Sequence, residues 1–210
     1  MILRKFRPNF SALAILSFKG INYIKLVFLV FLTTSLTVQA DWNLDESQSS
    51  IEFISIKNNR ILERHSFKKL SGSITSEGFV NVTIDLDSVD TKIPIRDQRM
   101  RNMLFETKIF PTATFSAKIS TNDLELEGEH FWVDEVKGRL NLHGLETNFK
   151  FKLIILNKNN SFRVVTNYPL SISAEDFNLN AGIAALQQIA GLDSISSVVP
   201  VILDLVFVES

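Results

Sequence analysis

The chain has 210 residues, 45% of them hydrophobic, and a formal net charge of −1 at pH 7. This length and apolar content predict one globular domain with a sizeable core. Because the arginines are scattered, the chain offers no basic face for nucleic acid, and the absence of cysteine excludes disulfides, thiolate metal sites, a cysteine nucleophile and a lipid-modified N-terminal cysteine.

Residues 1–40 have the pattern of a secretory signal peptide. They contain basic residues and no acidic one, and they end in an apolar run, Leu26 to Val38, followed by Gln39-Ala40. Since Val38 and Ala40 occupy the positions that the peptidase reads, we expect cleavage after Ala40 and export of residues 41–210 as one domain. The apolar run is shorter than the roughly 20 residues of a membrane-spanning helix. An uncleaved anchor, an organellar transit peptide and a misassigned start codon are the alternatives.

Residues 41–210 are dominated by an alternation of apolar and polar residues, which is typical of amphipathic strands. In residues 79–89, for example, Val80, Val82, Ile84 and Leu86 alternate with polar residues. The alternation predicts eight strands, at residues 50–57, 62–75, 79–89, 113–120, 132–142, 147–155, 161–174 and 198–207. Short polar turns separate most of them, so neighbouring strands are expected to pair antiparallel.

Two segments break the alternation. The first, Thr91 to Leu104, contains the charged sequence IRDQRMR, and Pro94 suits the first turn of a helix. Asp97 and Arg101 stand at i and i+4 in the favourable order. The apolar residues of this predicted helix fall near one face, and we expect this face to pack against the strands. They are Ile95, Met100, Met103 and Leu104. The second segment, AGIAALQQIAG at residues 181–191, also carries helix formers at helical spacing.

A meander of eight amphipathic strands either forms a sandwich or closes into a barrel, and closure removes the exposed edges. We therefore expect an all-β fold of eight antiparallel strands, a sandwich or a barrel, with a short helix between strands 3 and 4 and a helical segment before the last strand. The interior of such a barrel is either filled by side chains or able to hold one small ligand. The residue pattern leaves both open.

The polar residues show no recognisable catalytic or metal-binding arrangement. His65, His130 and His143 lack metal-ligand spacing, and no serine lies in a G-x-S-x-G turn. The alternating carboxylates at Asp85 and Asp87 and at residues 123–129 are best explained as a solvated strand face. We expect no catalytic residue, no metal and no cofactor.

Four fragments occur in a characteristic order: WNLDESQSSIEF, SVDTKIPIRDQRMRNMLFETKIFPTATF, GRLNLHGLETNFKFKL and ISAEDFNLN. In this order the chain resembles the YceI-like, or polyisoprenoid-binding, family of lipocalin-like barrels over residues 41–210. Gln48 replaces a histidine that is usual in the family's first fragment. Asn178 stands where the last fragment usually has glycine. These departures concern the identity of a ligand more than the fold.

The resemblance implies the barrel, an eight-stranded antiparallel lipocalin-like one. It also implies that this barrel is periplasmic and holds a long isoprenoid chain, such as a quinone tail or a polyprenyl lipid, in an apolar tunnel without catalysis. Arg96, Arg99 and Arg101 are candidates for contact with the head group. The residues expected to line the tunnel are Phe53, Val82, Ile84, Leu86, Phe105, Phe110, Phe115, Ile119, Leu140, Phe149, Phe151, Leu153, Leu170, Ile172, Phe177, Leu203 and Leu205. The expected partner is an isoprenoid or other long-chain lipid, with transient membrane contact and a homodimer as further expectations.

Two other functions compete with a carrier. A lipid-modifying enzyme would use Arg96, Asp97, Arg99 or Arg101 to polarise a head group at the tunnel mouth. A stress-related or adhesion protein would have a filled core and functional loops.

Overall fold

The computed structural model describes residues 42–120, 130–158 and 161–210, with the backbone alone at 130–134 and 158. The predicted signal peptide and its cleavage site lie outside the described residues, as do the carboxylates at 123–129. Within the described ranges, no helix has both the length and the apolar character needed to cross a membrane.

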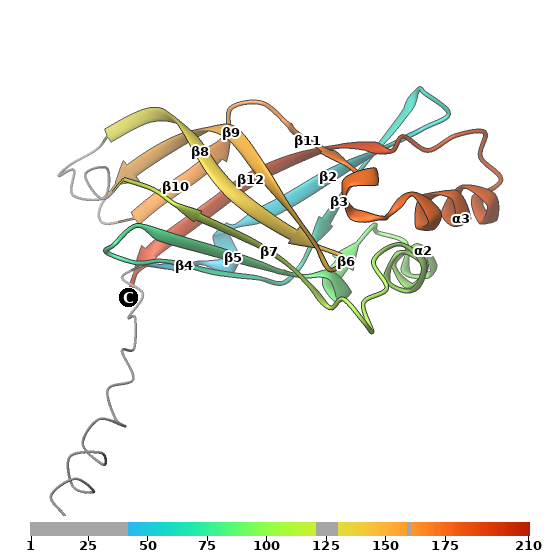
Figure 1. Ribbon diagram of the computed structural model, residues 1–210, viewed down its shortest axis with the longest axis horizontal. Coiled ribbons are helices and arrows are strands. Elements are labelled where there is room, and N and C mark those ends of the chain that lie inside the picture. Colours follow the sequence, from blue (N-terminus) through green and yellow to red (C-terminus); the bar gives the residue numbers. More distant parts are fainter. Residues whose placement is uncertain (1–41, 121–129, 159–160) are drawn as a thin grey trace, which may run out of the picture. The chain divides into compact units, whose positions relative to one another are not determined.

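The fold consists of twelve strand segments and a few short helices (Figure 1). The strands are β1 (Trp42–Leu44), β2 (Ser50–Lys57), β3 (Ile61–Phe67), β4 (Leu70–Ile74), β5 (Phe79–Asp85), β6 (Val89–Asp90), β7 (Thr112–Lys118), β8 (His130–Leu142), β9 (Leu145–Lys158), β10 (Ser161–Thr166), β11 (Leu170–Ser173) and β12 (Val198–Glu209). The helices are α2 (Pro94–Arg99), which continues into a π-helical turn (Met100–Leu104), and α3 (Asn180–Ala190). Single 3₁₀ turns lie at Glu46–Gln48, Leu86–Ser88 and Glu175–Phe177.

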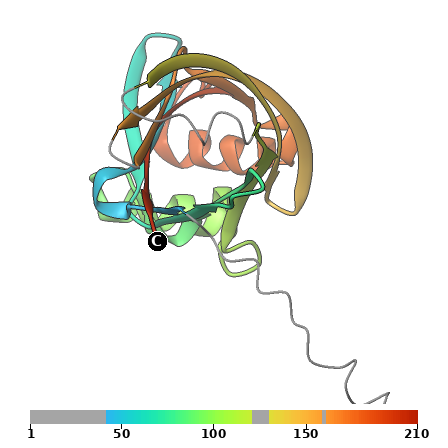
Figure 2. The same cartoon turned by 90° about the vertical axis from the view of Figure 1, so that its left-hand side faces the viewer.

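The strands form a closed antiparallel barrel. Four of the barrel strands are bent and consist of two segments each, namely β1 with β2, β3 with β4, β5 with β6, and β10 with β11. Each barrel strand pairs with the next along the chain, and β12 closes the ring by pairing with β10 and β11 on one side and with β1 and β2 on the other. Figure 2 shows this ring end-on, with α2 in green and α3 in orange behind it. The predicted eight-stranded antiparallel barrel is confirmed.

The prediction of one continuous strand at 62–75 was wrong in one respect: the strand is interrupted at Lys68 and Lys69, between β3 and β4. The backbone N–H groups of Lys68 and Lys69 both donate to the Ser88 hydroxyl oxygen, at 3.1 and 3.0 Å. A side chain therefore satisfies these two donors, which a continuous strand would direct at its neighbour. β1 was not predicted, because three residues are too few to show a period.

Two other predicted strands also break. The strand at 79–89 is interrupted by a 3₁₀ turn that begins where the Asp85 carboxylate accepts from the N–H of Asp87 at 2.9 Å. The strand at 161–174 is interrupted near Pro169, which lacks the N–H that a strand ladder requires.

The first predicted helix has Pro94 in its first turn, as expected, but its expected apolar face is split. Met100 is buried, whereas Ile95 is 52% exposed. The expected pair of Asp97 with Arg101 does not form: the Asp97 carboxylate accepts from the backbone N–H and the hydroxyl of Thr91, at 2.7 and 2.5 Å. α3 matches its prediction and ends at Gly191, whose φ of +61° suits glycine.

Two clusters of buried apolar side chains fill the barrel. The first lies toward the end of the barrel at which the C-terminus lies (Figure 1). It consists of Ile51, Leu70, Ile74, Val82, Val136, Leu153, Ile155, Phe162, Leu205 and Phe207. The second lies on the side of the helices and consists of Phe53, Leu86, Val89, Met100, Phe105, Ala113, Leu142, Ala174, Phe177 and Leu179. These two clusters do not fill the interior completely. A cavity remains inside the barrel.

Candidate functional site: an apolar cavity with a polar outer chamber

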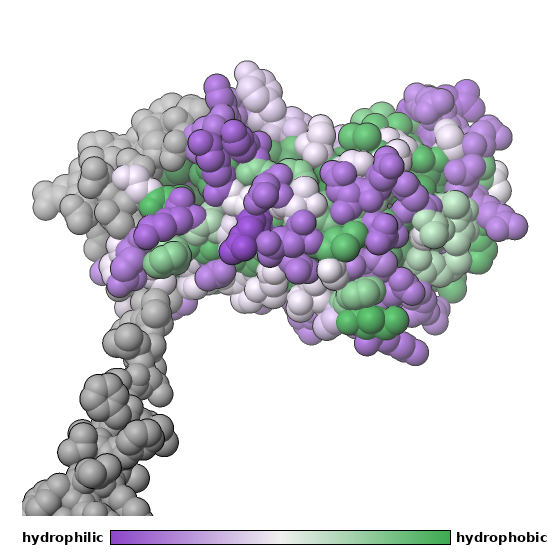
Figure 3. Space-filling view, viewed as in Figure 1, coloured by the Kyte–Doolittle hydropathy of each residue, from purple (hydrophilic) through white to green (hydrophobic). Residues whose placement is uncertain are grey.

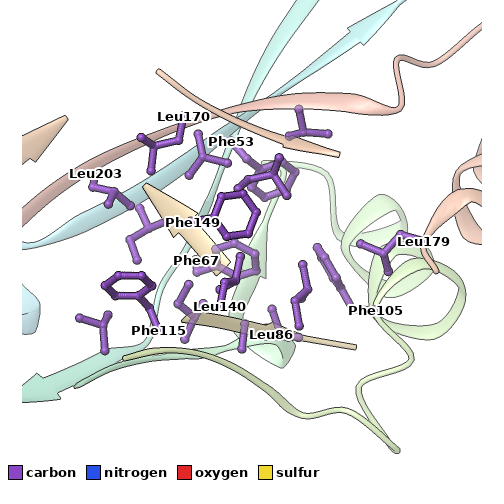
Figure 4. A pocket seen from close by; sticks show the side chains of 18 of the residues that line it. Phe53, Phe67, Leu86, Phe105, Phe115, Leu140, Phe149, Leu170, Leu179 and Leu203 are labelled. Atoms are coloured by element: carbon purple, nitrogen blue, oxygen red, sulfur yellow. The ribbon is translucent and has the colours of Figure 1, made fainter. Parts of the chain in front are cut away.

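An apolar cavity of about 190 Å³, here called the inner cavity, lies inside the barrel (Figure 4). Its wall comes from the inward side of the strands and from the helical end, as the labelled side chains Phe149, Phe115 and Leu179 show. Every residue that lines it is apolar. A space without polar partners does not hold ordered water well, so the inner cavity suits an apolar ligand.

Most of the residues predicted to line a tunnel do line the inner cavity. The period of two places all of them except Leu86 and Phe105 on the inward face of a strand. These residues are Phe53, Val82, Ile84, Leu86, Phe105, Phe115, Leu140, Phe149, Phe151, Leu170, Ile172, Leu203 and Leu205. Ile119 and Leu153 line a smaller cavity of about 70 Å³, and part of the wall, Phe115 for example, belongs to both cavities. That any of these residues binds a ligand remains a prediction.

Phe110 and Phe177 require correction, because neither belongs to the lining of these cavities. Phe177 is 0% exposed and stacks on Phe149, with ring centroids 6.2 Å apart, so it supports the wall from behind. The ring of Phe110 packs against His143 at 4.3 Å and beside Gly144, at the turn between β8 and β9.

Several lining residues were not predicted. They are Ile51, Phe67, Leu104, Ala113, Leu142, Ala174, Leu179, Ile183, Val199 and Val201. Ile51, Ala113, Val199 and Val201 share the inward register of predicted neighbours, so the strand period could have identified them. Leu104 comes from the π-helical turn, and strand periodicity has no means of locating such a residue.

A second and larger space, the outer chamber, adjoins the inner cavity at the helical end and has a volume of about 280 Å³. The residues that line it are Phe53, Ser55, Lys57, His65, Ile93, Ile95, Arg96, Arg99, Met100, Leu104, Ile183, Leu186, Ile189, Ala190, Leu192, Ile195, Ser196 and Val199. Phe53, Leu104, Ile183 and Val199 line both spaces, so the two share a wall. The two spaces therefore adjoin along these four side chains.

Aromatic rings mark the boundary between the two spaces. The ring centroids of Phe53, Phe67 and Phe105 lie 5.4 to 6.4 Å from one another. The ring of Phe53 also lies 5.1 Å from that of His65, which lines the outer chamber. Phe53 lines both spaces, whereas Phe67 and Phe105 line the inner cavity alone; the inner cavity's lining is entirely apolar, and that of the outer chamber includes charged side chains.

Two of the three arginines predicted to contact a head group line the outer chamber, and the third does not. Arg96 and Arg99 line it, and Arg96 also forms an ion pair with Glu63. Arg101 instead directs its guanidinium at Asp87, with 3.7 Å between Nε and the carboxylate oxygen. The prediction for Arg101 is therefore corrected: the turn of the helix carries it away from the chamber.

His65 is the most unusual polar group in the outer chamber. Its side chain is 4% exposed, its Nε2 lies 2.9 Å from the Ser55 hydroxyl, and its Nδ1 has no hydrogen-bond partner. Burial, with the nearby charge of Arg96 as a second cause, lowers the pKa of His65 to about 4. The imidazole is therefore neutral at neutral pH.

The pair Ser55 and His65 invites comparison with a nucleophile and its base, but the geometry does not support that role. A catalytic imidazole is held by an acceptor on the nitrogen that faces away from the serine, and that nitrogen is the unpartnered Nδ1. The nearest carboxylate, Glu63, lies 4.0 Å from Nε2. A base whose pKa is about 4 also takes up a proton poorly at neutral pH.

Among the side chains that the structure describes, no group of three or more His, Cys, Asp and Glu residues could hold a metal ion. The site thus combines an apolar cavity with a chamber that carries charge on one wall. This arrangement suits a ligand with an apolar chain and a polar end.

Comparison with known proteins agrees with this geometry. Residues 42–207 match the model of the YceI-like domain. A polyisoprenoid binding domain from Saccharophagus degradans, implicated in plant cell wall breakdown, has 33% identity and a TM-score of 0.80, and the match covers 82% of this chain and 100% of that one. BcnA of Burkholderia cenocepacia has 20% identity and a TM-score of 0.59 over 78% of this chain and 98% of that one, which shows the fold alone. Among curated proteins, no sequence matches this chain.

Proposed function

Because this chain belongs to the YceI-like domain family, we propose that it is a carrier that holds the long chain of an isoprenoid or similar lipid inside its barrel. The observation that carries the proposal is the inner cavity, whose lining contains no polar residue and which shares a wall with the charged outer chamber. The relative from Saccharophagus degradans, described as a polyisoprenoid binding domain, supports the isoprenoid class.

The physics of binding follows from the lining. Each methylene that leaves water for the inner cavity contributes about 0.8 kcal/mol. Affinity therefore depends on apolar contact along the ligand's chain and needs no reaction. Of the residues that the alternative of a lipid-modifying enzyme would use, Asp97 accepts hydrogen bonds from Thr91 and Arg101 faces Asp87, which favours binding without catalysis.

The test is a calorimetric titration with a prenyl alcohol, together with a series of shorter prenyl alcohols. We expect one ligand per chain and an affinity that rises with chain length until the cavity is full. Failure of every member of the series to bind would contradict the carrier role and would favour a barrel whose interior takes no ligand.

We further propose that the carrier works in the periplasm, on the strength of the signal-peptide pattern in residues 1–40. Fractionation of the host cell and sequencing of the mature N-terminus test this. We expect the protein in the periplasmic fraction with Asp41 as its first residue. Recovery of an uncleaved chain from the cytoplasm would contradict it.

Transient contact with a membrane is also part of the proposal. Ile93, Ile95 and Ile189, here called the chamber rim, line the outer chamber and are nevertheless exposed. Figure 3 shows apolar surface at the end of the barrel that carries α2 and α3. An apolar rim at the opening would allow a lipid chain to move between a membrane and the barrel with little exposure to water. The expected homodimer has no support among the described residues and is not proposed.

A further inference from the structure

Of the two spaces, the outer chamber is the one that can hold the polar end of a bound lipid. The inner cavity offers no polar lining residue, so a polar group placed there would lose its hydrogen bonds to water without compensation. The outer chamber adjoins it and supplies Lys57, His65, Arg96 and Arg99. The charges of this chamber therefore determine which head group is accepted.

Two of the three cations in the outer chamber already have an anionic partner. Lys57 and Arg96 both form ion pairs with the Glu63 carboxylate, which hydrogen bonding by Lys57 holds at a lowered pKa. Asp97, the other carboxylate nearby, accepts hydrogen bonds from Thr91. Neither carboxylate compensates a further positive charge.

Arg99 is the cation that remains. Among the described residues it has no ion pair and no hydrogen bond, although it lines the outer chamber beside apolar side chains such as Leu186 and Ile189. Next to apolar walls the attraction between opposite charges is stronger than in bulk water. An anion in the chamber would therefore gain more from Arg99 than it would at an open surface.

A buried polar atom points to a ligand independently of Arg99. Nδ1 of His65 has no partner, although the side chain is almost completely buried and lines the outer chamber. If the Ser55 hydroxyl donates to Nε2, the proton resides on Nδ1. Because Nδ1 is itself buried, a ligand oxygen accepts this proton after a movement of the side chains that cover the atom. Nε of Arg96 is a second buried donor without a partner. Such atoms are uncommon in native proteins and indicate a missing hydrogen-bond acceptor.

From these observations we propose that the outer chamber binds an anionic head group, a phosphate or a carboxylate, and that Arg99 supplies the charge that selects it. This inference rests on the proposed carrier function, because the head group belongs to the lipid whose chain occupies the inner cavity. It assigns the ligand to the acidic lipids and separates it from neutral alcohols with the same chain.

The experiment compares a prenyl alcohol with the prenyl monophosphate of identical chain length by calorimetry, in the native protein and in two variants. Arg99→Gln removes the uncompensated charge. Arg101→Gln is the matched control, because it removes the same charge from the same helical segment at a residue that faces Asp87. Inorganic phosphate alone tests whether the anion is recognised without a chain.

We expect the native protein to bind the phosphate at least tenfold more tightly than the alcohol, as one charge-assisted hydrogen bond allows. Arg99→Gln should lose most of this preference, Arg101→Gln should retain it, and inorganic phosphate should not bind measurably.

Equal affinity of the native protein for both lipids would overturn the inference and leave the carrier function intact. An equal loss in both variants would also overturn it, because the effect would then be one of net charge. Inorganic phosphate that binds as tightly as the prenyl phosphate would overturn the assignment to a lipid. If neither lipid binds, the carrier function fails, and the inference fails with it.

Discussion

Ala113 offers the sharpest test of the inner cavity. It lies on β7, is 3% exposed and lines the inner cavity. Ala113→Leu places about three further carbon-sized groups in the space that a lipid chain would occupy. At about 0.8 kcal/mol for each displaced methylene, the loss of binding free energy is about 2.4 kcal/mol, or a roughly sixtyfold weaker affinity.

The assay is calorimetric titration with a prenyl alcohol, alongside thermal unfolding of the ligand-free protein. Because leucine enters empty space, we expect the stability of the ligand-free variant to be unchanged or higher. Thr114→Leu, at the next and exposed position of the same strand, is the control and should bind normally. A folded Ala113→Leu variant with native affinity, or an equal loss in Thr114→Leu, would refute the assignment of the cavity.

Three further predictions concern the outer chamber and its helices. The pKa of His65 is about 4 in the folded protein and 6.5 ordinarily. Between these two pH values the unfolded chain binds a proton at His65 and the folded chain does not. The free energy of unfolding should therefore fall by on the order of 3 kcal/mol as the pH is lowered from 6.5 to 4. Chemical denaturation of His65→Gln across this window should show a clearly flatter pH dependence, and an unchanged slope would argue against a buried neutral imidazole. Ile95→Ser should weaken sedimentation with phospholipid vesicles several-fold, whereas Phe79→Ser, of similar exposure but at the opposite end of β5 from the helices, should not; equal losses would deny the chamber rim a specific role. A Cβ at Gly182 would lie 2.4 Å from the carbonyl oxygen of Met103, so Gly182→Ala should lower the unfolding free energy by about 1 to 3 kcal/mol in a denaturant titration, and native stability would show that α3 does not pack there as closely as described.

The strands were predictable because an alternation of apolar and polar residues is typical of a half-buried sheet. The same alternation fits a sandwich or a barrel, and the resemblance to the YceI-like family decided between them. The breaks in the strands were not predictable. Lys68 and Lys69 leave the sheet because Ser88, distant along the chain, accepts their N–H groups. A pattern within one strand contains no information about such a contact. Pro169 is the exception, since its missing N–H is visible in the sequence.

The predicted part of the inner cavity's lining comes mostly from strands, and strand residues that were missed, such as Ile51 and Val201, share the inward register of predicted neighbours. The residues that the helices supply could not be found in this way. Leu104 and Ile183 reach it from the π-helical turn and from α3. Their placement depends on how the helices dock, which periodicity does not specify. The three arginines of IRDQRMR show the same limit of the sequence pattern. Their spacing does not tell which of them contacts a head group. Docking of the helix separates Arg99, in the chamber, from Arg101, which faces Asp87.

The most direct test of the central claim is native mass spectrometry of the protein purified from the cells that produce it. We predict a species heavier than the mature chain by the mass of one lipid, which is lost on denaturation and recovered in an organic extract as a long-chain isoprenoid compound. Repeated recovery of the protein at the mass of the chain alone, with no lipid in the extract, would contradict the claim that the barrel is a lipid carrier.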